Sequence, residues 1–386
     1  MSILVNPLFS ILSAPSHSRT QLKGQLNYLA NATALTKLPE APAENQGCKF
    51  PDLIDEAAAL EWAGVSLGKT EVYRLYLSIK TLADGLPGEA DRCRLFGKIY
   101  TRGEPYYVVE VASLFEGEEI DPFKQEGKEG ANKYTYYVTQ TPEATSGWTK
   151  LPEVTMAQVV ACRQFKRLLT GDLEAAVPTF PVFPGNEANL LRTVIAIIGG
   201  ATLVSPDGFF EIDDDAGEVK LAEAEALNER FPKAGVEMKD PEAWKHHEVE
   251  LNALGRVKAL PEQLDDNGDP VEPENPVEPN PDLNGITAES WSIRVGPAGA
   301  GLASSSCAVA KSILYPGAVA VCQGRRFLNI YVGNGVMYSP TPYAPPLPQR
   351  TQSEWKPGEE EAPLTEEADV RADPTPPAVE GEGEEE

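Results

Sequence analysis

The sequence predicts an α+β fold, in which helices and strands occupy separate stretches of the chain. Apolar residues recur at helical spacing between 52 and 84 and again between 155 and 198. Runs rich in Val, Ile and Tyr fill 94–140 and 290–332, as expected for strands. Because no regular strand–helix–strand alternation connects these stretches, a doubly wound parallel sheet is not expected. Hydrophobic residues make up 41% of the 386, so a sizeable core can be buried.

Two helices are predicted in the first hundred residues. The first covers 52–63 and stops at Gly64, a residue that suits a helix C-terminus. The second covers 71–84, with Thr70 as its N-terminal cap and Gly85 as its stop. Its apolar residues form one stripe at helical spacing, which predicts a buried face: Val72, Leu75, Tyr76, Ile79 and Leu82.

The middle of the chain changes from strands to helices. Three strands are predicted at 94–101, 106–114 and 133–140. A third helix begins after Thr155 and stops near Gly171, and a fourth covers 187–198 and ends at Gly199. Two short strands follow at 201–204 and 208–212, and a solvated helix is predicted at 221–230.

The last folded part is predicted to be wholly β. Four runs separated by Pro and Gly indicate an antiparallel meander at 290–295, 306–314, 318–322 and 327–332. In the last run Leu328, Ile330 and Val332 alternate with Asn329 and Tyr331, so one of its two faces is expected to belong to the core.

Acidic residues are concentrated in two segments. The chain carries a net charge of -26; segment 261–282 holds eight acids and no bases, and segment 351–386 holds thirteen acids and two bases. Such composition predicts disorder. We therefore expect an unassigned segment over 1–37, one folded domain over 38–348 with an acidic linker at about 261–288, and a disordered tail over 349–386. Clustered acids repel phosphate, so neither nucleic acid nor membrane is an expected partner.

The five cysteines are scattered, and their odd number and the lack of a CxxC pair argue against a disulfide framework or a zinc site. Mostly buried, reduced thiols are expected, as in the cytoplasm. The N-terminal apolar run lacks a basic leader, and no apolar window is long enough to cross a bilayer, so neither a signal peptide nor a transmembrane helix is expected.

The stretch from Ala63 to Thr70 matches a relaxed phosphate-loop pattern through Gly68-Lys69-Thr70. A phosphate loop follows a strand, whereas the residues before Ala63 have helical spacing. A turn between two helices is therefore the preferred interpretation. A nucleotide-dependent enzyme that uses Lys69 remains the alternative.

Other sites of chemistry are poorly supported. The pattern of Asp265, Asn267 and Asp269 resembles a calcium loop, but Pro270 replaces the glycine that this loop needs. The run 213–215 is read as a solvated acidic turn. Of the three histidines, His17 lies in the unassigned start, and His246 and His247 are expected to face solvent or to be structural. No metal, cofactor or catalytic residue is predicted.

Two segments are candidates for contact with other proteins. Arg163, Lys166 and Arg167 form a basic cluster, predicted to lie on one exposed face of the third helix and to contact an acidic partner; an unpartnered solvated face is the alternative. Pro345, Pro348 and Arg350 fit a PxxPxR ligand for an SH3-like groove, which would make the chain an adaptor. An extended arm packed on its own complex is the preferred interpretation of that segment.

Several blocks of the sequence together resemble the radial spoke head proteins of motile cilia and flagella, in particular the larger pair of homologous head subunits. The blocks occur in the order of that family and cover 50–84, 94–111, 147–177, 183–211, 291–295 and 312–338. Trp62, Trp148 and the run Tyr315-Pro316-Gly317 lie in the most specific of them.

The resemblance implies a structural subunit without enzyme activity or cofactor. It implies assembly with homologous head subunits as homo- or heterodimers, together with other spoke head and stalk proteins. It also implies a place in the axoneme of the cilium or flagellum, where the spoke head faces the central apparatus and relays signals to the dynein arms that control beating. The match to the phosphate loop lies inside one of the family blocks.

Overall fold

The computed structural model of the chain divides into two units, Met1–Ala344 and Pro345–Glu386, and every residue described here lies in the first unit. The described residues are 48, 53–62, 64–65, 67–86, 90–113, 121–128, 130–143, 147–212, 219–231, 237–258, 263–264, 270–271, 283–296, 307–323 and 326–338. The segments 1–37 and 349–386, and most of the predicted acidic linker, lie outside them.

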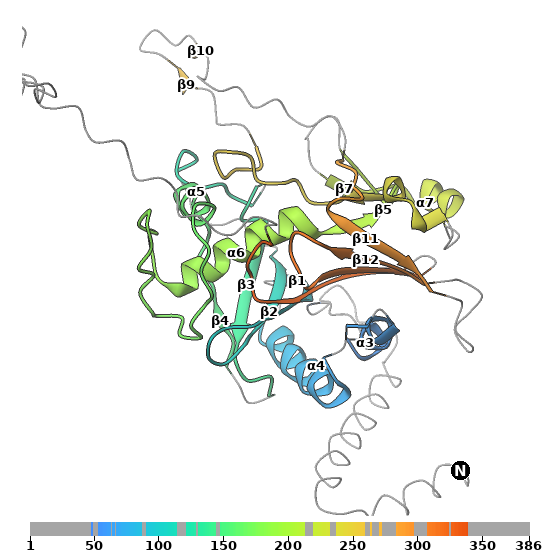
Figure 1. The fold of residues 1–386 in the computed structure, drawn as a ribbon, viewed down its shortest axis with the longest axis horizontal. Helices are drawn as coiled ribbons and strands as arrows, with labels where there is room; N and C mark the ends of the chain where they lie inside the picture. The colour runs from blue at the N-terminus through green and yellow to red at the C-terminus, as the bar shows by residue number, and fades with distance from the viewer. Residues whose placement is uncertain are drawn as a thin grey trace, which may run out of the picture. The chain divides into compact units, whose positions relative to one another are not determined.

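An eight-stranded sheet forms the centre of the first unit, in the order β11-β12-β13-β14-β1-β2-β3-β4 (Figure 1). Its strands are β1 (Ala90–Ile99), β2 (Tyr106–Ser113), β3 (Tyr134–Thr139), β4 (Thr149–Lys150), β11 (Trp291–Val295), β12 (Cys307–Ser312), β13 (Ala318–Gln323) and β14 (Arg326–Gly333). The strands predicted in the two halves of the chain are confirmed, and so is the antiparallel meander from β11 to β14.

A short parallel joint connects the two antiparallel halves of this sheet. Strands β1 and β14 pair over three positions only, where Gly97 is opposite Tyr331, Lys98 opposite Val332 and Ile99 opposite Gly333. At Gly97 the backbone has φ 155°, and a Cβ atom placed there would lie 1.8 Å from the Tyr331 carbonyl oxygen. The close approach of the two strands therefore requires glycine at position 97.

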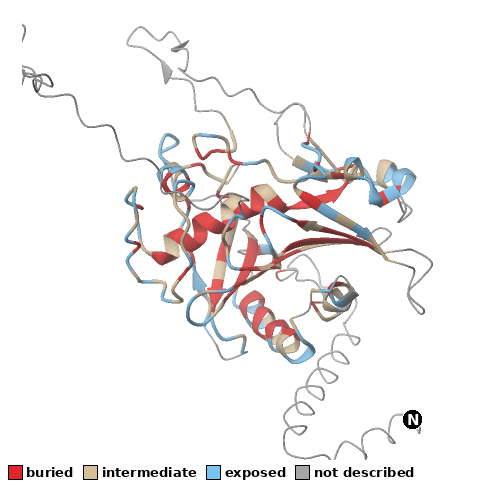
Figure 2. Ribbon diagram, viewed as in Figure 1, coloured by how far each residue is buried: buried red, intermediate tan, exposed pale blue. Residues whose placement is uncertain are grey.

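Helices cover both faces of the sheet. Helices α3 (Leu53–Trp62) and α4 (Lys69–Asp84) pack on one face. Helix α6 (Glu187–Thr202) and the shorter α5 (Met156–Cys162) lie on the other (Figure 1). Buried residues therefore follow both sides of the central strands (Figure 2). This arrangement explains why β13 reads as a nearly continuous apolar run instead of an alternating one.

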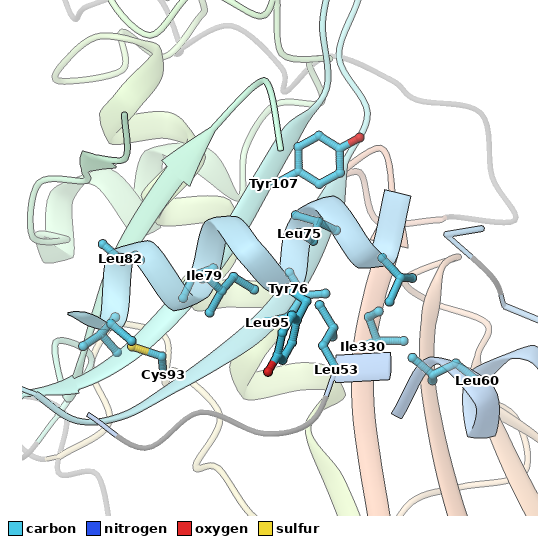
Figure 3. Packing of buried hydrophobic residues seen from close by; sticks show 14 of the residues in the cluster. Leu53, Leu60, Leu75, Tyr76, Ile79, Leu82, Cys93, Leu95, Tyr107 and Ile330 are labelled. Atoms are coloured by element: carbon cyan, nitrogen blue, oxygen red, sulfur yellow. The ribbon is translucent and has the colours of Figure 1, made fainter. Parts of the chain in front are cut away.

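The expectation that one face of the last strand belongs to the core is confirmed, and the structure shows that the opposite face is buried as well. Ile330 is 6% exposed and packs beneath α3 and α4, whereas its neighbour Tyr331 is 2% exposed and packs on the α6 side. Figure 3 shows Ile330 close to Leu53 and Leu60 of α3. Alternation in the sequence identified the first face correctly but could not show that a second layer covers the other one.

Three predicted helix ends need correction. Helix α4 begins at Lys69 with Gly68 as its N-cap, so Thr70 lies within the first turn and does not cap it. Helix α5 begins after a capping box of Thr155 and Gln158, as expected, but ends at Cys162 instead of near Gly171. Helix α6 continues through 199–200 to Thr202.

Neither of the two glycines of α6, Gly199 and Gly200, ends the helix, and Gly200 allows close packing. A Cβ atom at Gly200 would lie 3.3 Å from the backbone of Glu250, so the glycine allows another segment to approach the helix. The start of α6 follows a reciprocal capping box, in which the side chains of Asn186 and Asn189 accept hydrogen bonds from each other's backbone amides.

Smaller elements surround the layer on the α6 side. They are β5 (Val204–Pro206), β6 (Phe210–Ile212), β7 (Val219–Leu221), α7 (Ala224–Arg230), η1 (Glu237–Lys239), η2 (Pro241–Ala243), β8 (Trp244–His246), β9 (Gln263–Leu264) and β10 (Pro270–Val271). Helix α7 buries none of its residues, which confirms the predicted solvated helix. The pair β9–β10 lies within the stretch predicted as a linker.

Candidate functional site

The segment that matches a phosphate loop is a turn between two helices. The amides of Gly64 and Val65 close the end of α3 by donating to the carbonyls of Glu61 and Leu60, each at 3.0 Å. Helix α4 then begins at Lys69, whose side chain is exposed. Because a helix and not a strand precedes this turn, the segment lacks the strand-to-loop geometry that presents backbone amides to a phosphate chain. The preferred interpretation from the sequence is confirmed.

The basic cluster does not lie along one helix. Since α5 ends at Cys162, Arg163 caps the helix and Lys166 and Arg167 follow in irregular backbone. The Arg163 guanidinium donates to the carbonyls of Leu251 and Asn252 at 2.6 and 2.5 Å, and Arg167 donates to the carbonyl of Pro178 at 3.1 Å.

Two of the three cations therefore hold neighbouring segments of the same chain. Among the residues that the structure describes, no hydrogen bond or ion pair engages Lys166, which leaves it as the cation of the cluster best suited to an external partner. The second predicted contact segment, with Pro345, Pro348 and Arg350, lies outside the described residues.

Of the two roles expected for His246 and His247, facing solvent or structural, the structure shows the structural one. Burial lowers the pKa of His246 to about 4 and that of His247 to about 3. The His247 ring stacks on Phe210, with ring centroids 4.9 Å apart and the planes 18° from parallel. The Nδ1 atoms of both histidines are buried without a hydrogen-bond partner. Both rings are therefore held neutral, because the site does not solvate an imidazolium.

A cavity of about 490 Å³ lies where β1 and β14 diverge below their three-residue joint. Strand residues 92–95 of β1 and 327–330 of β14 form two of its walls. Helix α3 contributes Leu53, Glu56 and Leu60, and His247 and Glu248 line it from the other layer. The cavity thus follows from the geometry of the joint, because a parallel pair of only three positions leaves the remaining strand edges apart.

Charged groups in this cavity neutralise one another. Arg94 donates to both carboxylate oxygens of Glu110, at 3.2 and 2.9 Å, and the Tyr136 hydroxyl donates to the same carboxylate at 3.2 Å. Lys133 lies 3.8 Å from Glu248, whose pKa is raised by burial. The bidentate pair of Arg94 and Glu110 fixes the positions of both side chains. Together with the Lys133–Glu248 pair, it leaves little unbalanced charge for a substrate.

The lining of the cavity does not assemble a nucleophile with a base. Its cysteine, Cys93, has its sulfur 3.0 Å from that of Cys48, and the Nδ1 atom of His247 has no hydrogen-bond partner among the described residues. Across the described part of the chain, no group of three acidic, histidine or cysteine side chains is placed to hold a metal ion. The described lining of the cavity consists of packed side chains and of charges paired within the chain.

The two acidic runs that the sequence predicts as solvated turns, 213–215 and 265–269, lie outside the described residues. None of the described helices is both long and apolar enough to cross a membrane.

Sequence reasoning missed the buried carboxylate that organises the α6 side. Glu187, at the first position of α6, is 2% exposed. It accepts hydrogen bonds from the Tyr106 hydroxyl at 3.0 Å, from the amide and hydroxyl of Thr170 at 2.7 and 2.6 Å, and from the Gly171 amide at 2.8 Å. Its place after an N-cap asparagine identified a helix start, but nothing local indicated that the carboxylate turns inward.

The buried histidines predict a pH dependence of stability. In the unfolded chain each histidine takes up a proton near pH 6.5, whereas in the folded protein His246 and His247 stay neutral down to about pH 4 and 3. The unfolded state therefore binds more protons in this interval, and the free energy of unfolding falls as the pH drops from 6.5 towards 4. We expect at most about 1.4 kcal/mol per pH unit for each histidine.

Replacing His247→Phe tests this dependence while keeping an aromatic ring against Phe210. Urea titrations between pH 7 and 4.5 should give a shallower decline for the variant than for the original chain. Groups that titrate in both proteins, such as Glu248, cancel in the comparison. Equal slopes would show that His247 takes up its proton in the folded state as readily as in the unfolded chain.

The comparisons with known proteins agree on one family. The model of the family described as radial spokehead-like protein matches residues 16–129 and 113–376. A curated relative from Chlamydomonas reinhardtii, named flagellar radial spoke protein 4, is 32% identical over 91% of this chain and 81% of its own length.

Mammalian proteins match a smaller part of their own length. The human radial spoke head protein 4 homolog A is 31% identical over 84% of this chain and 52% of its own length. The mouse radial spoke head protein 6 homolog A is 32% identical over 80% of this chain and 53% of its own length. The chain thus spans about half the length of these two relatives.

Proposed function

Because the chain belongs to the radial spokehead-like protein family, we propose that it is a structural subunit of the radial spoke head in the axoneme of a motile cilium or flagellum. The observation that carries this proposal is the family match, which extends from residue 16 to residue 376 and includes every strand of the central sheet. Relatives named for the radial spoke cover 80% or more of the chain.

The described structure supports a scaffold role. The sheet is covered on both faces, and charged groups inside it, such as Glu187 and the pair Arg94–Glu110, are hydrogen-bonded to their own chain. Interiors of this kind are stiff and transmit force with little deformation. We infer that the protein acts by assembly and not by catalysis, and that its partners are homologous head subunits, other spoke head and stalk proteins, and the central apparatus.

Two parts of the chain are proposed contacts. Lys166 is the cation of the basic cluster that we assign to an acidic partner, with Arg163 and Arg167 holding the surrounding backbone in place. The segment of Pro345, Pro348 and Arg350 is proposed as an extended arm that packs on the assembly. Both contacts belong to the domain proposed for 38–348 or to the segment immediately after it.

Incorporation into axonemes tests the function. The tagged chain, expressed in motile ciliated cells that lack their own copy, should co-fractionate with isolated axonemes and restore spoke heads and normal beating. The variant Lys166→Glu should fold normally but incorporate at least several-fold less, because an acidic partner repels the reversed charge. Lys150→Glu, which reverses an exposed charge on β4, is the matched control and should incorporate fully.

The proposed role and the proposed contact are contradicted by different outcomes of this experiment. A chain that folds but never appears in the axoneme fraction would refute the role as a spoke head subunit. Incorporation of the Lys166→Glu variant at the original level would leave that role standing and would refute the assigned contact.

A further inference from the structure

Two cysteines that are far apart in the sequence have their sulfur atoms in contact. The Sγ atom of Cys48, in the segment before α3, lies 3.0 Å from the Sγ atom of Cys93 on β1, across 45 positions of sequence. Cys93 is completely buried, and Cys48 is 9% exposed. Figure 3 shows Cys93 beneath Leu82 and Ile79 of α4, within the core that joins both helices to the sheet.

This separation is only about 1 Å longer than a disulfide bond, and two sulfurs that merely pack together lie farther apart. A bond between Cys48 and Cys93 requires the two sulfur atoms to move about 1 Å closer to each other. We propose that Cys48 and Cys93 are a reversible modification site, at which exchange with a low-molecular-weight disulfide such as oxidised glutathione forms a bond between them. This inference goes beyond the proposed function and does not depend on it.

The exchange balances in two steps. The Cys48 thiolate attacks one sulfur of the small disulfide and releases one small thiol, which leaves a mixed disulfide on Cys48. The Cys93 thiolate then attacks the Cys48 sulfur and releases the second small thiol. The two protein thiols lose two protons and two electrons, and the small disulfide takes them up as two thiols.

Accessibility decides the order of these steps. Cys93 has no exposed surface, so the first attack falls to Cys48 at the edge of the core. Burial raises the pKa of both thiols, and the pKa of Cys48 is raised further by the nearby Asp91 carboxylate. Because the thiolate is the nucleophile, these raised pKa values slow the exchange, and its rate increases as the oxidised small disulfide accumulates.

The bond would fasten the helical layer to the sheet. It would close a loop that contains all of α3 and α4, so the segment before α3 would stay tethered to β1 when the helices separate from the sheet. Loop closure lowers the entropy of the unfolded chain, and the effect increases with loop length. The oxidised protein should therefore melt roughly 5–10 °C higher than the reduced protein.

The other three cysteines provide internal controls. Cys307 and Cys322 lie on adjacent strands, but Cys322 is opposite Ala308 and faces the core on the opposite side of the sheet from Cys307. Cys162 lies at the end of α5, in the core on the α6 side. The sulfur contact between Cys48 and Cys93 should direct oxidation to this pair, so selective oxidation should spare the other three cysteines.

The experiment treats the reduced full-length chain with oxidised glutathione and maps the cysteines by mass spectrometry. We expect one crosslinked peptide pair joining Cys48 to Cys93, a loss of these two free thiols, and a higher melting temperature that reverts on reduction. Cys48→Ser should abolish the crosslink and the shift, and Cys93→Ala does the same where it folds. Cys307→Ser is the matched control and should leave both unchanged.

Three outcomes would overturn the proposal. An unchanged count of free thiols shows that the pair does not react. A lasting mixed disulfide on Cys48 shows that Cys93 does not resolve it. Crosslinks spread over other cysteine pairs show that the contact between Cys48 and Cys93 gives no selectivity.

Discussion

Replacing Gly97→Ala should lower the free energy of unfolding by about 3 to 5 kcal/mol, because the change combines backbone strain with a steric clash. The φ angle of 155° at Gly97 is one that residues with a side chain rarely adopt. An added Cβ would also lie 1.8 Å from the Tyr331 carbonyl oxygen and 2.7 Å from the carbonyl carbon, so backbone atoms would have to move.

The cost is large because the backbone pairing between β1 and β14 is short. Their pairing covers three positions, and Gly97 with Tyr331 is one of them. If these strands separate, the antiparallel halves β1–β4 and β11–β14 lose their only backbone connection within the sheet of the described residues. Tyr331 would also lose its packing against Phe96, whose ring centroid lies 6.3 Å away.

Chemical denaturation of the variant measures this effect. Gly147→Ala is the matched control, because Gly147 is exposed and an added Cβ would meet no atom within 4 Å. The control should unfold within about 0.5 kcal/mol of the original chain. If Gly97→Ala were as stable as this control, the parallel joint between β1 and β14 would not exist as described.

Local signals in the sequence predicted most of the elements but not their assembly. The stripe from Val72 to Leu82 and the capping box at Thr155 are properties of short windows, and the structure has helices at both places. The pairing of β1 with β14 joins residues more than 230 positions apart, and no window contains both. The burial of the second sheet face, and with it that of Tyr331, depends on the layer that contains α6, which likewise comes from a distant part of the chain.

The candidate site was harder to predict for the same reason. The polar neighbours of His246 and His247 in the sequence left a solvent-facing and a structural role open, because the aromatic residues that pack on them, Phe210 and Trp291, come from other segments. The contact between Cys48 and Cys93 likewise depends on where the segment before α3 meets β1. The helix–turn–helix at Gly68 was predicted correctly because the helical spacing before it is visible within a dozen residues.

Replacing Ile330→Asp should lower the free energy of unfolding by at least about 4 kcal/mol. Ile330 is 6% exposed, is opposite Val319 on β13, and packs beneath α3 and α4. The variant loses the transfer energy of a buried aliphatic side chain and places a carboxylate in an apolar layer. Because β14 also carries the joint with β1, loosening at this position should spread to both halves of the sheet.

The pH dependence separates the cost of the charge from the cost of the cavity. A buried, unpaired carboxyl has a pKa above its unfolded value of about 3.9, so its neutral form is favoured in the folded state. Ile330→Asp should therefore lose stability as the pH rises above about 4, while Ile330→Asn, of similar size and without charge, should not. Ile313→Asp, at a position that is 40% exposed, is the control for adding an acid and should have little effect. Equal stabilities of the Asp and Asn variants at pH 4 and pH 7 would mean that solvent reaches position 330, and that α3 and α4 do not cover this face of β14 in solution.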